Sequence, residues 1–182
     1  RPALYPPVLG HLALAQFGLS TLRLAVTGAA TVPVEMVRRM ASELTFKTIV
    51  TGYGLTESTG IATMCRHTDD PDTIANTAGR PIPDVEVLVV GDDGTALGPG
   101  EPGEVIIRGY NVMAGYFGDE AATSEAIDAD GWLHTGDVGV FDEAGNLKIT
   151  DRTKDMFVVG GFNAYPAEIE NMLMEHPSVG QV

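Results

Sequence analysis

Apolar residues in the first third of the chain alternate between helical spacing and short continuous runs. The spacing predicts helices over Pro7–Leu19 and Pro33–Leu44, and the runs predict buried strands over Leu22–Val26 and Phe46–Val50. A turn of small residues, Thr27–Thr31, separates the first strand from the second helix. The order strand, turn, helix, strand indicates a parallel α/β layer, with ligand-facing loops at the ends of neighbouring strands.

The pattern of apolar and turn residues changes in the middle of the chain, where it predicts short strands that follow one another without long helices between them. Strands flanking Asp142–Asn146 carry the signature of a hairpin. This part predicts a β-rich, mostly antiparallel unit. Its predicted elements are strands at Val85–Val90, Glu104–Arg108, Gly139–Phe141 and Leu147–Ile149, a turn at Gly91–Gly94 and a short helix at Glu120–Ile127.

A third pattern of residues begins at Asp151. Val158-Val159 predicts a short strand, and Pro166–Glu175 predicts an amphipathic helix whose inward face carries Ile169, Met172 and Leu173. The predicted fold class is therefore α/β: the end of a parallel layer, then the antiparallel unit, then a stub of a small α+β domain. The domain boundary falls between residues 1–150 and 151–182.

The net charge of the chain argues against some classes of ligand. The 182 residues carry 11 Lys and Arg against 25 Asp and Glu, a net charge of -14. This balance argues against nucleic acid and anionic membrane surfaces, which are bound through Lys and Arg. It does not argue against ATP, because a small polyanion is held by local groups and its own Mg²⁺. With Cys65 as the only cysteine, no internal disulfide is possible, which fits a reducing, cytoplasmic setting; the residue itself is best interpreted as a small buried apolar side chain.

The uncharged stretch between Arg1 and Arg23 is a poor membrane span. Pro6, Pro7 and Gly10 interrupt it. It also lacks the basic region and cleavage pattern of a signal peptide. We therefore expect no transmembrane segment.

The strongest chemical signal is the stretch Thr51–Thr59, directly after an apolar run. Two glycines, Gly52 and Gly54, frame Tyr53. Glycine lets backbone approach a ligand closely, and an aromatic ring can cover a flat one. Because Thr56 can bond a phosphate oxygen and Glu57 can hold Mg²⁺, the stretch predicts a nucleotide-triphosphate site at a strand end.

Two further polar clusters follow. Trp132–Asp137 fits a tight turn as well as a binding loop, and Asp151–Asp155 fits a solvated charged turn. An arginine fork beside a carboxylate acceptor, however, suits a ribose diol. The order in which the clusters occur favours the binding interpretation.

The complete set of motifs resembles the adenylate-forming superfamily, in its acyl-CoA synthetase and fatty-acid–CoA ligase branch. The motifs that carry the resemblance are Thr27–Ala30, Tyr53–Glu57, Gly79–Pro81, Pro102–Glu104, His134–Asp137, Asp151–Asp155 and Gly160–Glu170. The resemblance covers nearly the whole chain. It implies an acid–thiol ligase of lipid metabolism that forms an acyl-adenylate from ATP and a carboxylic acid, then transfers the acyl group to CoA.

The resemblance also implies roles for individual residues. It gives Thr56, Glu57 and Lys154 catalytic roles, with Glu57 on Mg²⁺ and Lys154 at a hinge between domains. It gives nucleotide contacts to Gly28, Ala29, Ala30, Gly52, Tyr53, Gly54, Leu55, Thr56, Asp137, Ile149 and Arg152. It gives CoA contacts to Gly160, Gly161 and Phe162.

Two parts of the family's machinery, its phosphate loop and its C-terminal catalytic lysine, have no counterpart in these residues. We therefore interpret residues 1–150 as the C-terminal part of a large domain, and residues 151–182 as the hinge and the start of a small one. We expect the isolated chain to have negligible ligase activity. The alternatives are an adenylation domain that loads a carrier protein, and a non-catalytic structural or interaction fragment. Thr63–Arg66 resembles actinobacterial ligases, including those for bicyclic propanoates from steroid breakdown.

Overall fold

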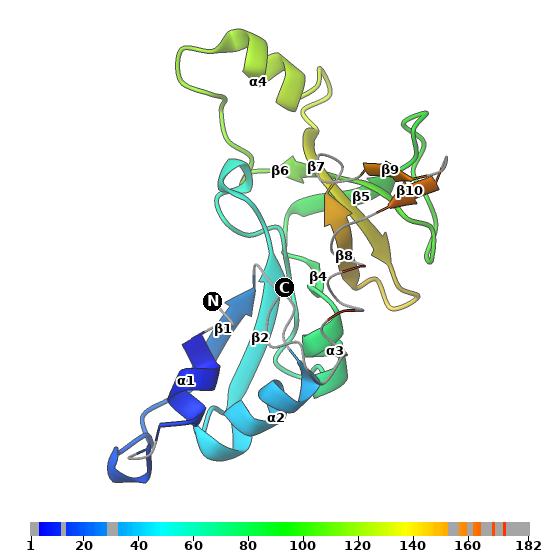
Figure 1. Ribbon diagram of the computed structural model, residues 1–182. Helices are drawn as coiled ribbons and strands as arrows, with labels where there is room; N and C mark the ends of the chain where they lie inside the picture. Colours follow the sequence, from blue (N-terminus) through cyan, green and yellow to red (C-terminus); the bar gives the residue numbers. More distant parts are fainter. Residues whose placement is uncertain are drawn as a thin grey trace.

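The computed structural model describes residues 4–11, 14–28, 33–152, 157–159, 162–164, 169 and 173. Two four-stranded sheets follow one another along the chain (Figure 1). The first part contains α1 (Tyr5–Leu9), a 3₁₀ turn η2 (Leu14–Gln16), β1 (Leu24–Gly28), α2 (Val34–Glu43), β2 (Thr48–Tyr53), a 3₁₀ turn η3 (Thr56–Ser58), β3 (Thr63–Met64), α3 (Pro71–Asn76) and β4 (Arg80–Pro81). The second contains β5 (Val85–Val90), β6 (Gly103–Gly109), α4 (Glu120–Ala126), β7 (Leu133–Phe141) and β8 (Leu147–Arg152), and a separate hairpin contains β9 (Phe157–Val159) and β10 (Phe162–Ala164).

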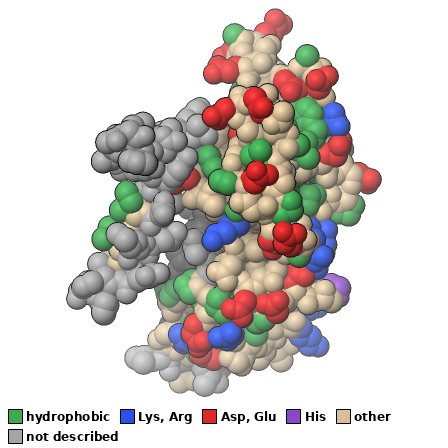
Figure 2. All heavy atoms as spheres, turned by 90° about the vertical axis from the view of Figure 1, so that its right-hand side faces the viewer, with side chains coloured by type: hydrophobic (Ala, Val, Ile, Leu, Met, Phe, Trp, Pro, Cys, Tyr) green, Lys and Arg blue, Asp and Glu red, His purple; other side chains and the backbone are tan. Residues whose placement is uncertain are grey.

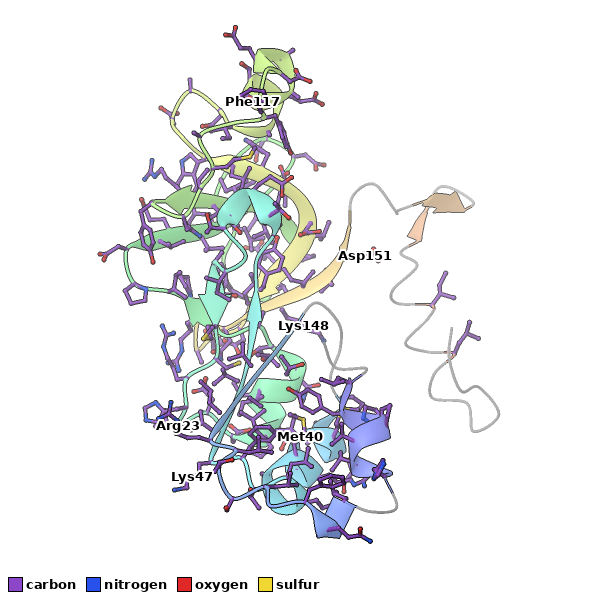
Figure 3. All side chains as sticks on the ribbon, turned by 90° about the vertical axis from the view of Figure 1, so that its left-hand side faces the viewer. Arg23, Met40, Lys47, Phe117, Lys148 and Asp151 are labelled. Atoms are coloured by element: carbon purple, nitrogen blue, oxygen red, sulfur yellow. The ribbon has the colours of Figure 1, made fainter. Side chains whose placement is uncertain are left out.

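The first sheet has the order β1-β2-β3-β4, and its β1–β2 pair is parallel. The parallel pair confirms the α/β layer that the sequence predicts. α1, α2 and α3 supply the core against it, with Met40 of α2 fully buried and directed into this core (Figure 3). Leu24 and Val26 of β1 are 50% and 52% exposed, so the described helices do not cover both faces of β1.

The second sheet is antiparallel throughout, in the order β5-β6-β7-β8. This confirms the predicted β-rich unit, and the predicted strand Val85–Val90 has the observed bounds of β5. The second core lies under this sheet and also takes in Ala62, Tyr53 and Leu55 from the segment that leaves the first sheet. The end of β2 therefore packs against the second unit.

Three predicted elements need correction. The helix predicted over Pro7–Leu19 is wrong, because α1 ends at Leu9 with Gly10 as its cap and the 3₁₀ turn η2 follows. The strand predicted to end at Val50 continues to Tyr53, because β3 pairs with its last residues. The tight turn considered for Trp132–Asp137 is instead the first half of β7 from Leu133 onward.

Few residues after Arg152 are described, so little of the structure predicted for residues 151–182 can be compared. The short strand at Val158-Val159 lies within β9, which pairs antiparallel with β10. Of the predicted helix Pro166–Glu175, the structure describes Ile169 and Leu173, both helical. These side chains are 37% and 40% exposed, so the expectation that they face a core is wrong for the described residues.

Acidic side chains outnumber basic ones on the face drawn in Figure 2 and are most numerous toward the α4 end, in line with the net charge of -14. No helix in the described ranges is long and apolar enough to span a membrane.

Candidate functional site

A short hydrogen bond joins the first two of the three predicted polar clusters. Tyr53, the last residue of β2, donates its hydroxyl to Asp137 Oδ2 of β7 across 2.6 Å, over a sequence separation of 84 residues. Asp137 is 7% exposed, so its carboxylate is held at the junction of the two units with little access to bulk water. The structure thus brings Tyr53 and Asp137 together at one site.

β8 brings Asp151 and Arg152, the described residues of the third cluster, to the same place. Asp137 and Arg152 are cross-strand partners in the β7–β8 register, and Val138 pairs with Asp151. Figure 3 shows Asp151 near the end of β8 where the described strand stops. Asp151 is buried at 6% exposure. In this register the backbone of Arg152 lies beside that of Asp137.

The glycines of the site lie where neighbouring backbone approaches them closely. Gly28 and Gly52 are register partners at the ends of β1 and β2, and a Cβ built on Gly28 would lie 2.6 Å from the carbonyl oxygen of Gly52. A Cβ on Gly54 would lie 2.5 Å from the backbone of Ile61. None of these three has a positive φ. Glycine is required at Gly52 and Gly54 because neighbouring protein fills the space that a Cβ would take.

Thr56 and Glu57 open η3 immediately after the glycines. Thr56 is exposed and Glu57 is half-buried. The Tyr116 hydroxyl donates to Glu57 Oε1 across 2.8 Å, and the Met113 N–H donates to the Glu57 carbonyl across 2.7 Å. The bond to Glu57, aided by burial and by the charge of Glu57, raises the pKa of Tyr116.

Tyr116 is the site residue that sequence reasoning missed. It lies 59 residues after Glu57, in the segment before α4, and no motif links the two. The same segment holds the residues that follow η3 at two other points, because the Thr59 hydroxyl donates to the Asn111 carbonyl across 2.7 Å and the Asn111 amide donates to the Ile61 carbonyl across 2.7 Å. The segment therefore fixes the backbone that carries Glu57.

The donor set fits Mg²⁺ that is shared with phosphates. Among the described residues, no group of three or more His, Cys, Asp or Glu is arranged to hold a metal by itself. Mg²⁺ on a nucleotide takes one or two carboxylates and completes its octahedron with phosphate oxygens and waters. Glu57 offers one such carboxylate, with Oε1 oriented by Tyr116.

The remaining predicted contacts divide into packed residues and residues beyond the described ranges. Ile149 and Leu55 pack against the second core. Gly28 is placed with Gly52, as described above. Ala29, Ala30, Lys154, Gly160 and Gly161 lie outside the described residues, and Phe162 is described only as part of β10.

A shallow hollow of about 400 Å³ lies elsewhere, between the end of α3 and the β7–β8 hairpin. Its lining includes Asn76, Phe141 and Lys148, the last of which is marked in Figure 3. None of the predicted site residues lines it. The candidate site is therefore defined by contacts around Tyr53 and Glu57 and not by this hollow.

Known proteins share this arrangement of motifs and sheets. The family model described as AMP-binding enzyme matches residues 2–117, which include β2, η3 and the segment that holds Glu57. The chain belongs to the AMP-binding enzyme family. Membership agrees with the adenylate-forming resemblance of the motifs.

Two curated relatives illustrate the similarity in sequence. A 3-[(3aS,4S,7aS)-7a-methyl-1,5-dioxo-octahydro-1H-inden-4-yl]propanoyl:CoA ligase of Mycobacterium tuberculosis is 56% identical over 172 residues, 94% of this chain and 32% of that protein. A long-chain-fatty-acid–CoA ligase of Escherichia coli O157:H7 is 41% identical over 179 residues, 98% of this chain and 31% of that protein. The chain thus spans about a third of the length of the curated relatives it matches.

A solved structure shows that the fold is shared. An amide bond synthetase from Marinactinospora thermotolerans superposes with a TM-score of 0.85 at 34% identity, over 99% of this chain and 36% of that one. The relatives named as CoA ligases support a ligase for a protein of full family length.

Proposed function

We propose that this chain forms the adenosine-binding and metal-binding wall of an ATP-dependent acyl-CoA synthetase. One observation carries the proposal: the 2.6 Å bond from Tyr53 to Asp137 unites two family motifs at the junction of the two sheets. A buried carboxylate held by a neighbouring hydroxyl is a pre-oriented acceptor, which is what a ribose diol requires. Membership of the AMP-binding enzyme family supports an adenine nucleotide as the ligand.

In this proposal the predicted residues have separate tasks. Asp137 accepts from the ribose hydroxyls, with Arg152 alongside. Gly28, Gly52 and Gly54 allow the tight backbone packing that shapes the adenine side. Thr56 contacts phosphate and Glu57 holds Mg²⁺, which supplies charge stabilisation at the reacting phosphorus. Lys154 acts as the hinge between half-reactions, and Gly160, Gly161 and Phe162 approach CoA.

The proposed acid is a bicyclic propanoate of the type in the name of the M. tuberculosis relative, which at 56% identity is more similar than the E. coli fatty-acid ligase at 41%. The complete reaction is proposed for a protein of the relatives' length, since this chain spans about a third of them. This chain alone is proposed to lack ligase activity and to act in the cytoplasm as part of that protein.

The test measures AMP release by a protein of the relatives' length that contains this chain, with ATP, Mg²⁺ and a panel of carboxylic acids. Bicyclic propanoates are compared with fatty acids of several lengths, and the acceptor is CoA, an amine or a carrier protein. We expect AMP release with a bicyclic propanoate and CoA, and a loss of about 100-fold in Asp137→Ala from the lost charged hydrogen bonds to ribose. Asp93→Ala, in an exposed turn, is the control.

The outcomes separate the alternatives. Transfer to a carrier protein but not to CoA would support the adenylation-domain alternative, and transfer to an amine would support an amide synthetase. Pyrophosphate exchange by this chain alone would contradict its proposed inactivity. Absence of any acid-dependent AMP release would favour a non-catalytic module.

A further inference from the structure

β7 departs from a regular strand at the residues just before and at Asp137. In the β6–β7 register, Glu104 pairs with Val138 and Ile106 pairs with His134. Val105 alone therefore lies opposite Thr135, Gly136 and Asp137, which form a bulge. Gly136 has φ 68°, a left-handed conformation that favours glycine. The bulge decides where the Asp137 side chain points.

Hydrogen bonds to β6 hold Thr135 and Gly136 of this bulge, and Thr135 in turn holds Asp137. The Thr135 hydroxyl donates to the Val105 carbonyl across 2.6 Å and accepts from the Asp137 N–H across 3.1 Å. The Gly136 N–H donates to Glu104 Oε1 across 3.2 Å. One carboxylate on β6 therefore contacts the residue that directly precedes Asp137.

The second oxygen of Glu104 is also engaged. Glu104 Oε2 lies 3.0 Å from His134 Nδ1, and His134 Nε2 lies 3.7 Å from Asp128 Oδ2. With Nδ1 protonated, the ring donates to Glu104 and spans from β6 to the turn that follows α4. Glu104 thus contacts both His134, which precedes the bulge, and Gly136 at its centre. A carboxylate can accept at both oxygens, whereas an amide has one oxygen and one donating NH₂.

We propose that Glu104 is a positioning residue for Asp137, with His134 as its second anchor. By holding the bulge open, Glu104 directs the Asp137 carboxylate to Tyr53 and to the ribose. This inference rests on the proposed function, because it takes Asp137 as the ribose acceptor. A structural role alone would change stability, whereas a positioning role changes recognition of the ribose hydroxyls.

The first experiment measures amide hydrogen exchange by NMR in this chain and in Glu104→Gln. We expect the Gly136 and Asp137 amides to exchange at least about tenfold faster in the variant, since a bond to a charged acceptor contributes enough for that change. The matched control is Glu86→Gln, which removes a carboxylate of the same sheet from its exposed pair with Arg108 at 2.9 Å. Should Glu104→Gln not fold, Glu104→Asp keeps the charge but is too short to reach both donors. Unchanged exchange at Gly136 would overturn the inference.

The second experiment compares binding of AMP and 2′,3′-dideoxy-AMP by calorimetry, in this chain or, if it does not bind, in the protein of full family length. We expect the wild type to favour AMP by about tenfold or more, and Glu104→Gln to lose most of that ratio. Glu86→Gln should retain it. A ratio retained in Glu104→Gln would overturn the positioning role. A ratio of one in the wild type would instead overturn the ribose role of Asp137 in the proposed function, while the exchange experiment still decides whether Glu104 holds the bulge.

Discussion

The Tyr53 hydroxyl and the Asp137 carboxylate meet across 2.6 Å, although 84 residues separate them in the chain. Tyr53 ends the central strand of the first unit and Asp137 lies in the bulge of the second. The bond is therefore both a contact between the two units and a means of fixing one carboxylate in space. Any change in the relative position of the two sheets would therefore change the position of the Asp137 carboxylate.

We predict that Tyr53→Phe weakens AMP binding and lowers stability together. The change removes a hydrogen bond to a charged acceptor, a contribution of about 1.5–3 kcal/mol to the free energy of unfolding. Urea unfolding measures the stability, and calorimetry measures AMP affinity. The control is Tyr110→Phe, since Tyr110 is 73% exposed. Equal unfolding midpoints for the two variants would refute a stabilising role for the bond.

We predict that Gly54→Ala destabilises the chain by about 1–3 kcal/mol or more, the usual cost of overpacking. The added Cβ would lie 2.5 Å from Ile61 backbone atoms, which cannot move aside as a flexible side chain could. Gly18→Ala is the control, because nothing lies within 4 Å of its added Cβ and its φ is not positive. Urea unfolding of both variants is the measurement. A loss in Gly18→Ala as large as that in Gly54→Ala would show that the close approach is not the cause.

Local signals in the sequence were sufficient for much of the fold. Alternation and turn residues predict β5 and the β7–β8 hairpin, because those elements depend on neighbouring positions. The hydrophobic pattern does not predict α3, although Asp70 accepts from the backbone of Asp72 and Thr73 as an N-cap and Pro71 follows in the first turn. The pattern places the end of β2 too early because β3, from further along the chain, pairs with its last residues up to Tyr53.

The candidate site was predictable only as a set of motifs. Their order indicated that Asp137 and Arg152 belong together, and the β7–β8 register pairs them. Tyr116, the partner of Glu57, is brought to it by a tertiary contact that no periodicity reveals. The contact of Glu104 with Gly136, next to Asp137, depends on a bulge that is equally hidden in the sequence. The packing role of Gly52 and Gly54 is not visible in the sequence either, because β3 and Ile61 come close to them only in the folded chain.

Asp142 makes part of the stability dependent on pH. Burial raises the pKa of this carboxyl, but hydrogen bonds from the Asn146 side chain and from the backbone of Asn146, Ala144 and Gly145 outweigh it, so the pKa is lowered. A lowered pKa contributes stability above the ordinary aspartate pKa of about 3.9, and that stability is lost as the pH falls through the folded value. We therefore predict that Asp142→Asn is less stable than the wild type at pH 7 and that the difference shrinks below about pH 4.

Urea midpoints at several pH values measure this difference. The control is Asp92→Asn, an exposed aspartate in the turn after β5. Its difference from the wild type should stay small throughout. A constant difference between Asp142→Asn and the wild type from pH 7 to pH 3 would contradict the assignment.

The stability of the first unit should depend on α2 more than on the exposed side of β1. Met40 is 0% exposed in the first core, whereas Leu24 is 50% exposed. Met40→Ala leaves a cavity in a packed interior and should cost about 2–5 kcal/mol, while Leu24→Ala removes atoms that already contact water and should cost about 0.5 kcal/mol or less. Urea unfolding of the two variants gives the comparison. Comparable losses would mean that another surface covers Leu24 in solution, because only a buried leucine contributes as much as a buried methionine.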